Sequence, residues 1–450
     1  MRNWISTDHE NIQQIDTMPL STRQLYGPLY IASAYLSGTF GLFLLIGQAK
    51  LVPNMFKLAV YVLSTIVLFA SGYVLRMRSL PRMVRLADTT TLEVRSATLW
   101  ITLSAGYLAA FGVASMLSFG AKEPGDILAS ITHPGAAYSA KFGIYELQTA
   151  TGERNSVIQI LTILAVLSTP LVPMTIIYWR RLGLGTKLIA GLGVVCYAAF
   201  FLFIGTLKGL GDLLVYGLAG ILVSALGTWH PLRGFGNNKV RAVFAGILLI
   251  GFVGYMANNQ SQRMVVFGIA GKYEPTPVVA ALVGDSLGRG LSAVGSYPTQ
   301  GYLGLAYNLD TPFEWTRGLG SSRAVGSYWD QYIGSSGTSE LTYPARTELR
   351  TGWPAGMYWA TIYPWLASDL TFPGAAIFMG AVGWMFAKFW HQGAFRRSRL
   401  SLLLFCQLAL LLIYVPANNQ IGIGRPSMIA FLSLVAIYLF KRPGRASKSL

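Results

Sequence analysis

Ten apolar runs limit how this chain can fold. Each is roughly 17 to 23 residues long, the length that a helix needs to cross about 30 Å of hydrocarbon. Hydrophobic residues make up 53% of the chain and charged residues 12%, which leaves too little polar surface to coat a soluble globule. The sequence therefore predicts an all-α polytopic membrane protein with about ten transmembrane helices, near residues 25–47, 56–75, 97–119, 156–178, 187–207, 210–228, 240–258, 372–390, 399–416 and 425–441.

The spacing of these runs divides the chain into three parts. Residues 1–258 are expected to form an N-terminal bundle of seven spans, and residues 372–450 three further spans and a cytoplasmic tail. Residues 259–371 between them are expected to form a large outer loop. Its apolar stretches at 277–291 and 352–370 do not make convincing spans, so we expect short helices that lie at the membrane interface.

The positive charge follows the expected topology. The formal net charge is +17, and with the N-terminus inside, the cytoplasmic segments hold 21 of the 35 basic residues but 5 of the 18 acidic ones. An excess of Lys and Arg in cytoplasmic loops orients membrane helices, so nucleic acid is not needed as a partner to explain the charge. We expect both termini in the cytoplasm and no signal peptide, because the first 24 residues contain no short apolar core with a cleavage site.

Short catalytic motifs give little support for a soluble-enzyme chemistry. Gly284 to Gly288 (GDSLG) match the nucleophile elbow, but that motif needs a strand, a sharp turn and a histidine base. Here it falls in a helical pattern, and the outer histidine, His133, belongs to another loop. The sequence contains no phosphate-binding P-loop, no zinc-protease motif and no Cys/His cluster, so we expect no cofactor and no metal.

Lys208 is the cation with the most unusual setting. It follows the fifth apolar run in IGTLKGLGD, where the chain turns back. A lysine at a helix end commonly extends its ammonium to the membrane surface and needs no further role. Alternatively, the flanking Gly205, Gly209 and Gly211 allow a bulky anionic group to approach both backbone and ammonium.

Eight further basic residues lie on the outer side and form the most informative set. Arginine presents a planar fork that suits phosphate oxygens, and several converging forks could hold a diphosphate. Each residue alone is more often solvated or paired with a nearby acid. The set comprises Arg263, Lys272, Arg289, Arg317, Arg323, Arg346, Arg350 and Arg425.

One outer carboxylate precedes the eighth run. Asp369 in WLASDLTFPG could act as the N-terminal cap of that helix, which needs no function. At the rim of an outer cavity, it could instead accept a proton from a sugar hydroxyl.

Several of these stretches give a family resemblance. The chain resembles bacterial O-antigen polymerases of the Wzy type, enzymes that link lipid-carried oligosaccharide repeat units. The resemblance rests on five short elements in similar order and membrane placement: HPGAAY ending at Tyr138, GTLKG at Gly205 to Gly209, TQGYLGLAYNLDTPFEWTRGLGSS at Thr299 to Ser322, WLASDLTFPG at Trp365 to Gly374, and PANNQ at Pro416 to Gln420.

The resemblance implies a GT-C-like membrane glycosyltransferase in the bacterial inner membrane, with its active site facing the periplasm. Such an enzyme moves a growing glycan from undecaprenyl diphosphate to the nonreducing-end hydroxyl of a lipid-linked repeat unit, with no metal. Its partners are the undecaprenyl-diphosphate-linked oligosaccharide and membrane lipids, and a polysaccharide chain-length regulator is a further candidate partner.

The resemblance also suggests roles for particular residues. By position it implies that Lys208 binds diphosphate, while Arg263, Arg289, Arg317, Arg350 and Tyr302 are candidates for substrate binding. The catalytic base is left open among Asp369, Glu314 and Asp285. We expect Ala in place of Lys208 or Arg350 to stop chain elongation.

Two other functions remain as alternatives. An O-antigen ligase would transfer glycan to lipid A core, and related ligases place a histidine near their chemistry, which residues 259–371 lack. A flippase or exporter of lipid-linked glycan would need a cation-lined path through the bundle. Here the cations in the expected spans, Lys57, Lys187 and Lys388, stay near the ends.

Overall fold

The protein is a bundle of α-helices. This computed structural model describes residues 17–85, 90–151, 155–229, 254–256, 258–259, 262, 276–356 and 358–441. Two short strands, β1 (Thr17–Pro19) and β2 (Met83–Arg85), pair antiparallel. The α-helices are α1 (Thr22–Leu45), α2 (Met55–Arg78), α3 (Thr91–Ser118), α4 (Pro124–Thr132), α5 (Pro134–Thr151), α6 (Ser156–Ile163), α7 (Leu171–Tyr178), α8 (Leu184–Phe203), α9 (Lys208–Leu226), α11 (Pro277–Val283), α12 (Asp285–Leu309), α13 (Arg323–Tyr332), α14 (Thr338–Leu341), α15 (Tyr343–Thr351), α16 (Tyr363–Ala394), α17 (Arg399–Tyr414), α18 (Gln420–Ile423) and α19 (Arg425–Phe440).

Several of these helices are suited to a membrane. Among the described residues, six helices are long and apolar enough to cross one: α1, α2, α3, α8, α9 and α16. Residues Ser156–Ile163 and Ala165–Arg181 would form a seventh span with a 70° bend, while α17 and α19 are shorter apolar helices. The chain is therefore an all-α protein with the character of a multi-pass membrane protein. The expected span at 240–258 lies largely outside the described residues.

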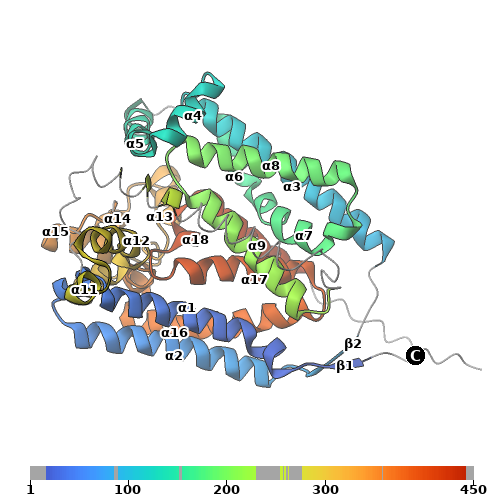
Figure 1. The fold of residues 1–450 in the computed structure, drawn as a ribbon, viewed down its shortest axis with the longest axis horizontal. Coiled ribbons are helices and arrows are strands. Elements are labelled where there is room, and N and C mark those ends of the chain that lie inside the picture. The colour runs from blue at the N-terminus through green and yellow to red at the C-terminus, as the bar shows by residue number, and fades with distance from the viewer. Residues whose placement is uncertain are drawn as a thin grey trace, which may run out of the picture.

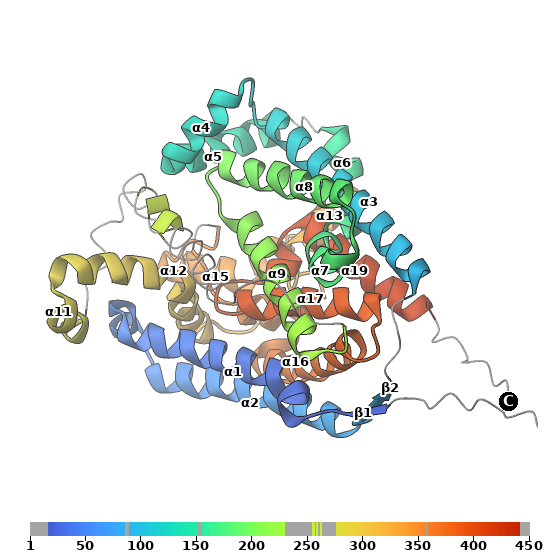
Figure 2. The ribbon, with the colours of Figure 1, turned by 45° about the vertical axis from the view of Figure 1, so that its right-hand side comes forward.

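The long helices form two groups joined by a central layer (Figure 1). α1, α2 and α16 pack together along one side of the molecule, and α3 pairs with α8 along the other. α9 and α17 contact each other between these groups, and α7 packs against α9. Figure 2 shows the same grouping from a second direction, with α11, α12 and α15 gathered at the end of the bundle far from β1 and β2. The two ends of the bundle thus have different structures.

Side chains at the helix starts explain where several helices begin. Ser21 and Gln24 form a reciprocal capping box at α1, and Thr90 and Glu93 form another at α3. Asn54 caps α2 by accepting from the Lys57 N–H. Each cap satisfies backbone N–H groups that have no partner within the helix.

Arginines join helix termini at the strand end of the bundle, which we call the basic end. Arg399 at the start of α17 donates to the Glu93 carbonyl (2.7 Å), the Ser96 hydroxyl (2.9 Å) and the Tyr178 hydroxyl (3.2 Å). Arg397 donates to the Thr228 carbonyl at 2.6 Å. Because these contacts join segments far apart in the chain, the two cations stabilise the packing of the bundle as well as contributing charge.

The segment expected as an outer loop is more helical than its sequence suggests. We expected one short helix at 277–291, but α11 ends at Val283, before Gly284 with φ +79°, and α12 continues to Leu309 with Pro298 inside it. The GDSLG motif therefore spans a break between two helices and follows no strand. α16 begins at Tyr363, and its backbone breaks at Thr371 (φ 63°, ψ 166°), immediately before the span expected from 372.

Glycines allow α2 and α16 to pack closely. A Cβ added to Gly383 of α16 would lie 2.0 Å from the Phe69 carbonyl oxygen of α2, and one on Gly72 would lie 1.9 Å from the Gly380 oxygen. The backbones of α2 and α16 approach this closely only because no side chain separates them. This packing of small residues is a common way to join helices in a membrane.

Replacing Gly383 with Ala should separate α2 from α16. Inserting one carbon into such a contact costs about 1–3 kcal/mol, so we expect the apparent thermal midpoint in detergent to fall by several degrees. Gly41→Ala in α1 is the matched control, because an added Cβ there meets nothing within 4 Å, and it should leave the midpoint unchanged or raise it. Equal midpoints for both variants would contradict the close packing.

Candidate functional site

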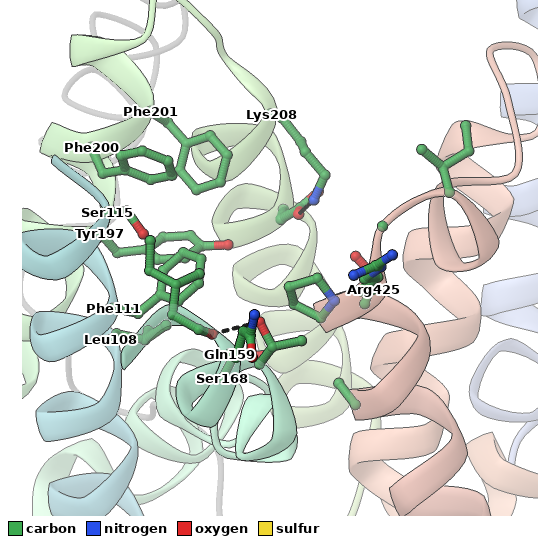
Figure 3. A pocket seen from close by; sticks show the side chains of 18 of the residues that line it. Leu108, Phe111, Ser115, Gln159, Ser168, Tyr197, Phe200, Phe201, Lys208 and Arg425 are labelled. Carbon is green, nitrogen blue, oxygen red and sulfur yellow. Dashed lines mark hydrogen bonds and ion pairs between the residues drawn. The ribbon is translucent and has the colours of Figure 1, made fainter. Parts of the chain in front are cut away.

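A cavity of about 750 Å³ opens at the end of the bundle opposite the basic end. Its walls come from α3, α5, α6, α8, α9, α13, α17, α18 and α19. Figure 3 shows Phe111 on α3 and Tyr197, Phe200 and Phe201 on α8 along one wall, with Lys208 and Arg425 reaching the space from α9 and α19. The cavity therefore combines aromatic walls with cationic side chains from separate helices.

Three of the helices that begin at this cavity start with a basic residue. Lys208 is the first residue of α9, Arg323 of α13 and Arg425 of α19, and all three line the cavity. The N-terminal end of a helix already carries a partial positive charge, so a cation there is unfavourable for the helix itself. In α9 and α19 the first-turn N–H groups also have no side-chain cap. Three such ends around one space make it suited to bind an anion.

The three cations have different partners. The Lys208 ammonium pairs with Asp212 Oδ2 at 2.7 Å and lies 5.9 Å from the centre of the Phe201 ring. Arg425 donates from Nε to the Ser327 hydroxyl at 3.1 Å, and its guanidinium lies 4.4 Å from the centre of the Tyr328 ring. Arg323 is exposed and makes no hydrogen bond or ion pair with another described residue.

Asp212 is a buried carboxylate that sequence reasoning missed. Its side chain is 9% exposed, it lines the cavity, and its Oδ1 atom has no hydrogen-bond partner among the described residues. In the sequence, Asp212 stands four residues after Lys208, and side chains at this spacing on one helix contact each other.

Aromatic side chains shape the rest of the cavity. Tyr328 and Tyr332 of α13 stack with ring centres 6.0 Å apart and an interplanar angle of 19°, and both line the cavity. Tyr332 is 68% exposed, so the cavity reaches the surface on this side. Rings that present a flat apolar face and a polar edge are suited to contact sugars.

The turn before Lys208 packs against the HPGAAY element. Gly205 has φ +61°, and a Cβ there would lie 2.4 Å from the Pro134 carbonyl oxygen and 2.7 Å from the Tyr138 nitrogen. Glycine is therefore needed for both the backbone conformation and the close approach. This contact fixes where α9 starts, and so where Lys208 lies.

Asp369 organises the loop that leads into α13. Its carboxylate accepts from the Thr316 hydroxyl, from the Gly318 N–H at 2.8 Å, and from the Ser321 N–H and hydroxyl, both at 2.7 Å. Asn419 adds a bond from its side-chain amide to the Ser321 carbonyl at 2.6 Å. Asp369 lies within α16, so it does not cap that helix, and its hydrogen bonds assign it a structural role in holding this loop.

Four other sequence candidates between residues 259 and 371, all with described side chains, lie apart from the cavity. Glu314 pairs with Arg346 at 2.9 Å, and Arg350 donates to the Asp310 carbonyl at 2.7 Å. Arg317 is exposed in the loop around Asp369, with φ +56°. None of these four side chains lines the cavity.

Tyr302 is a core residue in this structure. It is 1% exposed, its hydroxyl lies 2.9 Å from the Thr39 hydroxyl, and its ring packs against Phe40 and Phe43. Nearby Gly301 allows α12 to contact the PANNQ element, since an added Cβ would lie 2.0 Å from the Pro416 oxygen. We therefore leave Tyr302 out of the functional set.

Four candidates cannot be placed. Arg263 and Lys272 lie outside the described residues, and the side chains of Asp285 and Arg289 in α12 do as well. Within the described part of the chain, no group of three or more His, Cys, Asp or Glu side chains could hold a metal ion.

Outside the spans, the hydroxyl and backbone N–H of Ser336 lower the pKa of Asp330 on α13.

No protein-family model matches the chain, and no significant similarity to a curated protein or to a solved structure is found.

Replacing Asp369 with Ala should release the loop from Thr316 to Ser321. Hydrogen bonds to a charged group contribute about 1.5–3 kcal/mol each and do not add fully, so we expect a local loss of about 3 kcal/mol. Amide exchange at Gly318 and Ser321 should then be about 100-fold faster. Glu314→Gln, which removes an exposed ion pair from the same end, should leave those amides protected. Unchanged exchange in Asp369→Ala would contradict the structural role.

Proposed function

We propose that this protein is a GT-C-like O-antigen or polysaccharide polymerase, which transfers a growing glycan from undecaprenyl diphosphate to the nonreducing-end hydroxyl of a lipid-linked repeat unit. The observation that carries the proposal is the convergence of Lys208, Arg323 and Arg425 at the first residues of three helices around one cavity. A diphosphate is the part of the substrate that this arrangement would bind.

The cavity suits the remaining parts of such a substrate. Its volume of about 750 Å³ falls within the usual range of roughly 300–1,000 Å³ for ligand sites. That is room for a diphosphate and adjoining sugar, with the lipid and the rest of the glycan outside. Tyr328 and Tyr332 offer aromatic faces for the sugar, and Gln159 on α6 offers an amide for hydroxyl groups.

In the proposed reaction, the acceptor hydroxyl attacks the anomeric carbon and the lipid diphosphate leaves. Negative charge grows on the leaving oxygen in the transition state, so cations fixed beside it lower the barrier. Lys208 is best placed for this task, because the Gly205 turn sets its position and its ammonium has freedom to move from Asp212 to a phosphate oxygen.

The proposed topology has about ten spans in the inner membrane, with both termini in the cytoplasm. The basic end, where Arg397 and Arg399 join helix termini, would face the cytoplasm under the positive-inside rule. The cavity at the opposite end would then open to the periplasm, where lipid-linked repeat units are polymerised in the enzymes that the sequence resembles.

Replacing Lys208 with Ala should stop elongation while the protein remains folded. Loss of one group that stabilises developing charge typically costs about 100- to 1,000-fold in rate. Purified protein incubated with defined undecaprenyl-diphosphate repeat units should then yield single units on a sizing gel, where the native protein gives ladders. Lys57→Ala is the matched control, because Lys57 forms an exposed ion pair with Asp310 and does not line the cavity.

Arg350→Ala is a second control that revises the expectation from sequence. Because Arg350 lies outside the cavity wall, ladders should persist in this variant.

Normal ladders from Lys208→Ala would contradict the proposed role of the cavity. Transfer to a lipid A acceptor without elongation would indicate a ligase, and movement of lipid-linked glycan across vesicles without either reaction would indicate a flippase.

Replacing Arg323 with Ala should weaken anion binding without loss of stability. Arg323 makes no hydrogen bond or ion pair with another described residue, so the apparent thermal midpoint should not change. Removing one charge-assisted contact should raise the Kd for inorganic pyrophosphate roughly tenfold, as measured by calorimetry. An unchanged Kd would place the anion away from α13.

A further inference from the structure

We propose that Asp212 accepts the proton of the attacking sugar hydroxyl, and that the bound diphosphate prepares it for this role by drawing Lys208 away from it. This inference rests on the proposed polymerase function and assigns the base that the sequence left open. It concerns a residue outside the 259–371 segment, in which the sequence candidates for a base were sought.

Asp212 is the one carboxylate among the described residues that line the cavity. Of the earlier candidates, Asp369 has its carboxylate occupied by four donors from the 316–321 loop. Glu314 is exposed and paired with Arg346 outside the cavity. A base must come within hydrogen-bonding reach of the hydroxyl that it serves, and Asp212 meets that condition for a substrate in the cavity.

Helix stability does not account for the Lys208–Asp212 pair. An acid four residues before a base is the favourable order on a helix, and here the order is reversed. Lys208 also stands at the positive end of the α9 dipole, which disfavours a cation. Gly209 and Gly211 lie in the same turn, and glycine lowers helix propensity by about 1 kcal/mol relative to Ala. The pair therefore adds little to the stability of α9, and both of its side chains line the cavity.

One oxygen of Asp212 is prepared for a further donor. Oδ2 holds the Lys208 ammonium at 2.7 Å, while Oδ1 is buried and has no partner among the described residues. A buried acceptor left unpaired costs about 1–3 kcal/mol, more when it is charged. A sugar hydroxyl that donates to Oδ1 would recover that energy and would align its O–H bond with the carboxylate.

Diphosphate binding would then couple the two substrates. Its oxygens compete with Asp212 for the Lys208 ammonium, and the Lys208 side chain is 36% exposed and able to turn. Once Lys208 contacts phosphate, Asp212 Oδ2 loses its ammonium partner, and the carboxylate is left to accept from the sugar hydroxyl. The acceptor is therefore activated only when a donor occupies the cavity.

The step balances without another reagent. The acceptor oxygen forms a bond to the anomeric carbon, and its proton passes to Asp212. The bond between the anomeric carbon and the phosphate oxygen breaks, and its electron pair leaves with the lipid diphosphate, which Lys208, Arg323 and Arg425 retain as an anion. Release of the product returns the proton to water and Lys208 to Asp212.

The test compares elongation kinetics with pyrophosphate binding in the purified full-length protein. Asp212→Asn should lower kcat about 100-fold or more, the usual contribution of a general base, without a rise in KM for the donor. The same variant should bind inorganic pyrophosphate more tightly than the native protein, because Lys208 no longer has an internal competitor. Sodium formate should partly restore the kcat of Asp212→Ala but not that of Lys208→Ala.

Asp310→Asn is the matched control, because Asp310 forms an ion pair with Lys57 at 2.8 Å outside the cavity. It should change neither kcat nor pyrophosphate binding.

A kcat for Asp212→Asn within about fivefold of native protein would overturn the base role and leave the polymerase function standing. Loss of pyrophosphate binding together with kcat, without rescue by formate, would show that Asp212 only holds Lys208 in place. Native protein that binds pyrophosphate but does not elongate would overturn the polymerase function, and the base role with it.

Discussion

Repulsion between like charges is the constraint that the cavity has to satisfy. α9, α13 and α19 each begin there, so three positive helix ends and the side chains of Lys208, Arg323 and Arg425 share one space. Asp212 neutralises one of these cations, and the Tyr328 ring partly compensates another through a cation–π contact. An anion in the cavity would relieve the remaining repulsion, which is why the proposed ligand is a diphosphate.

The rest of the fold keeps these helix starts in place. Asp369 and Asn419 hold the 316–321 loop, which determines where α13 begins. The Gly205 turn, packed against Pro134, does the same for α9. At the other end, Arg399 joins three helices through one guanidinium. The cavity is thus built on the ends of fixed helices, and sites supported in this way keep their geometry better than sites on free loops.

The sequence predicted local properties better than long-range contacts. Lys208 was identified from its position beside glycines at a turn, and it does line the cavity. The arginines were harder, because sequence shows charge but not direction: Arg323 and Arg425 reach the cavity, whereas Arg350 turns to the Asp310 carbonyl. Asp369 was recognised as important, yet whether its carboxylate faces a ligand or a loop depends on residues about 50 positions away. Tyr302 shared a motif with functional candidates but is buried between aromatic rings.

The sequence by itself determined that this is an all-α protein with several helices long and apolar enough to span a membrane, because the length and apolarity of each run are local properties and backbone groups in lipid must be satisfied within a helix. It also determined that a cation stands in a glycine-rich turn at Lys208. Only the tertiary structure decided which charges meet. Helices α9, α13 and α19 begin more than 100 residues apart along the chain, and their convergence on one cavity beside Asp212 results from packing between distant helices, which no local pattern records.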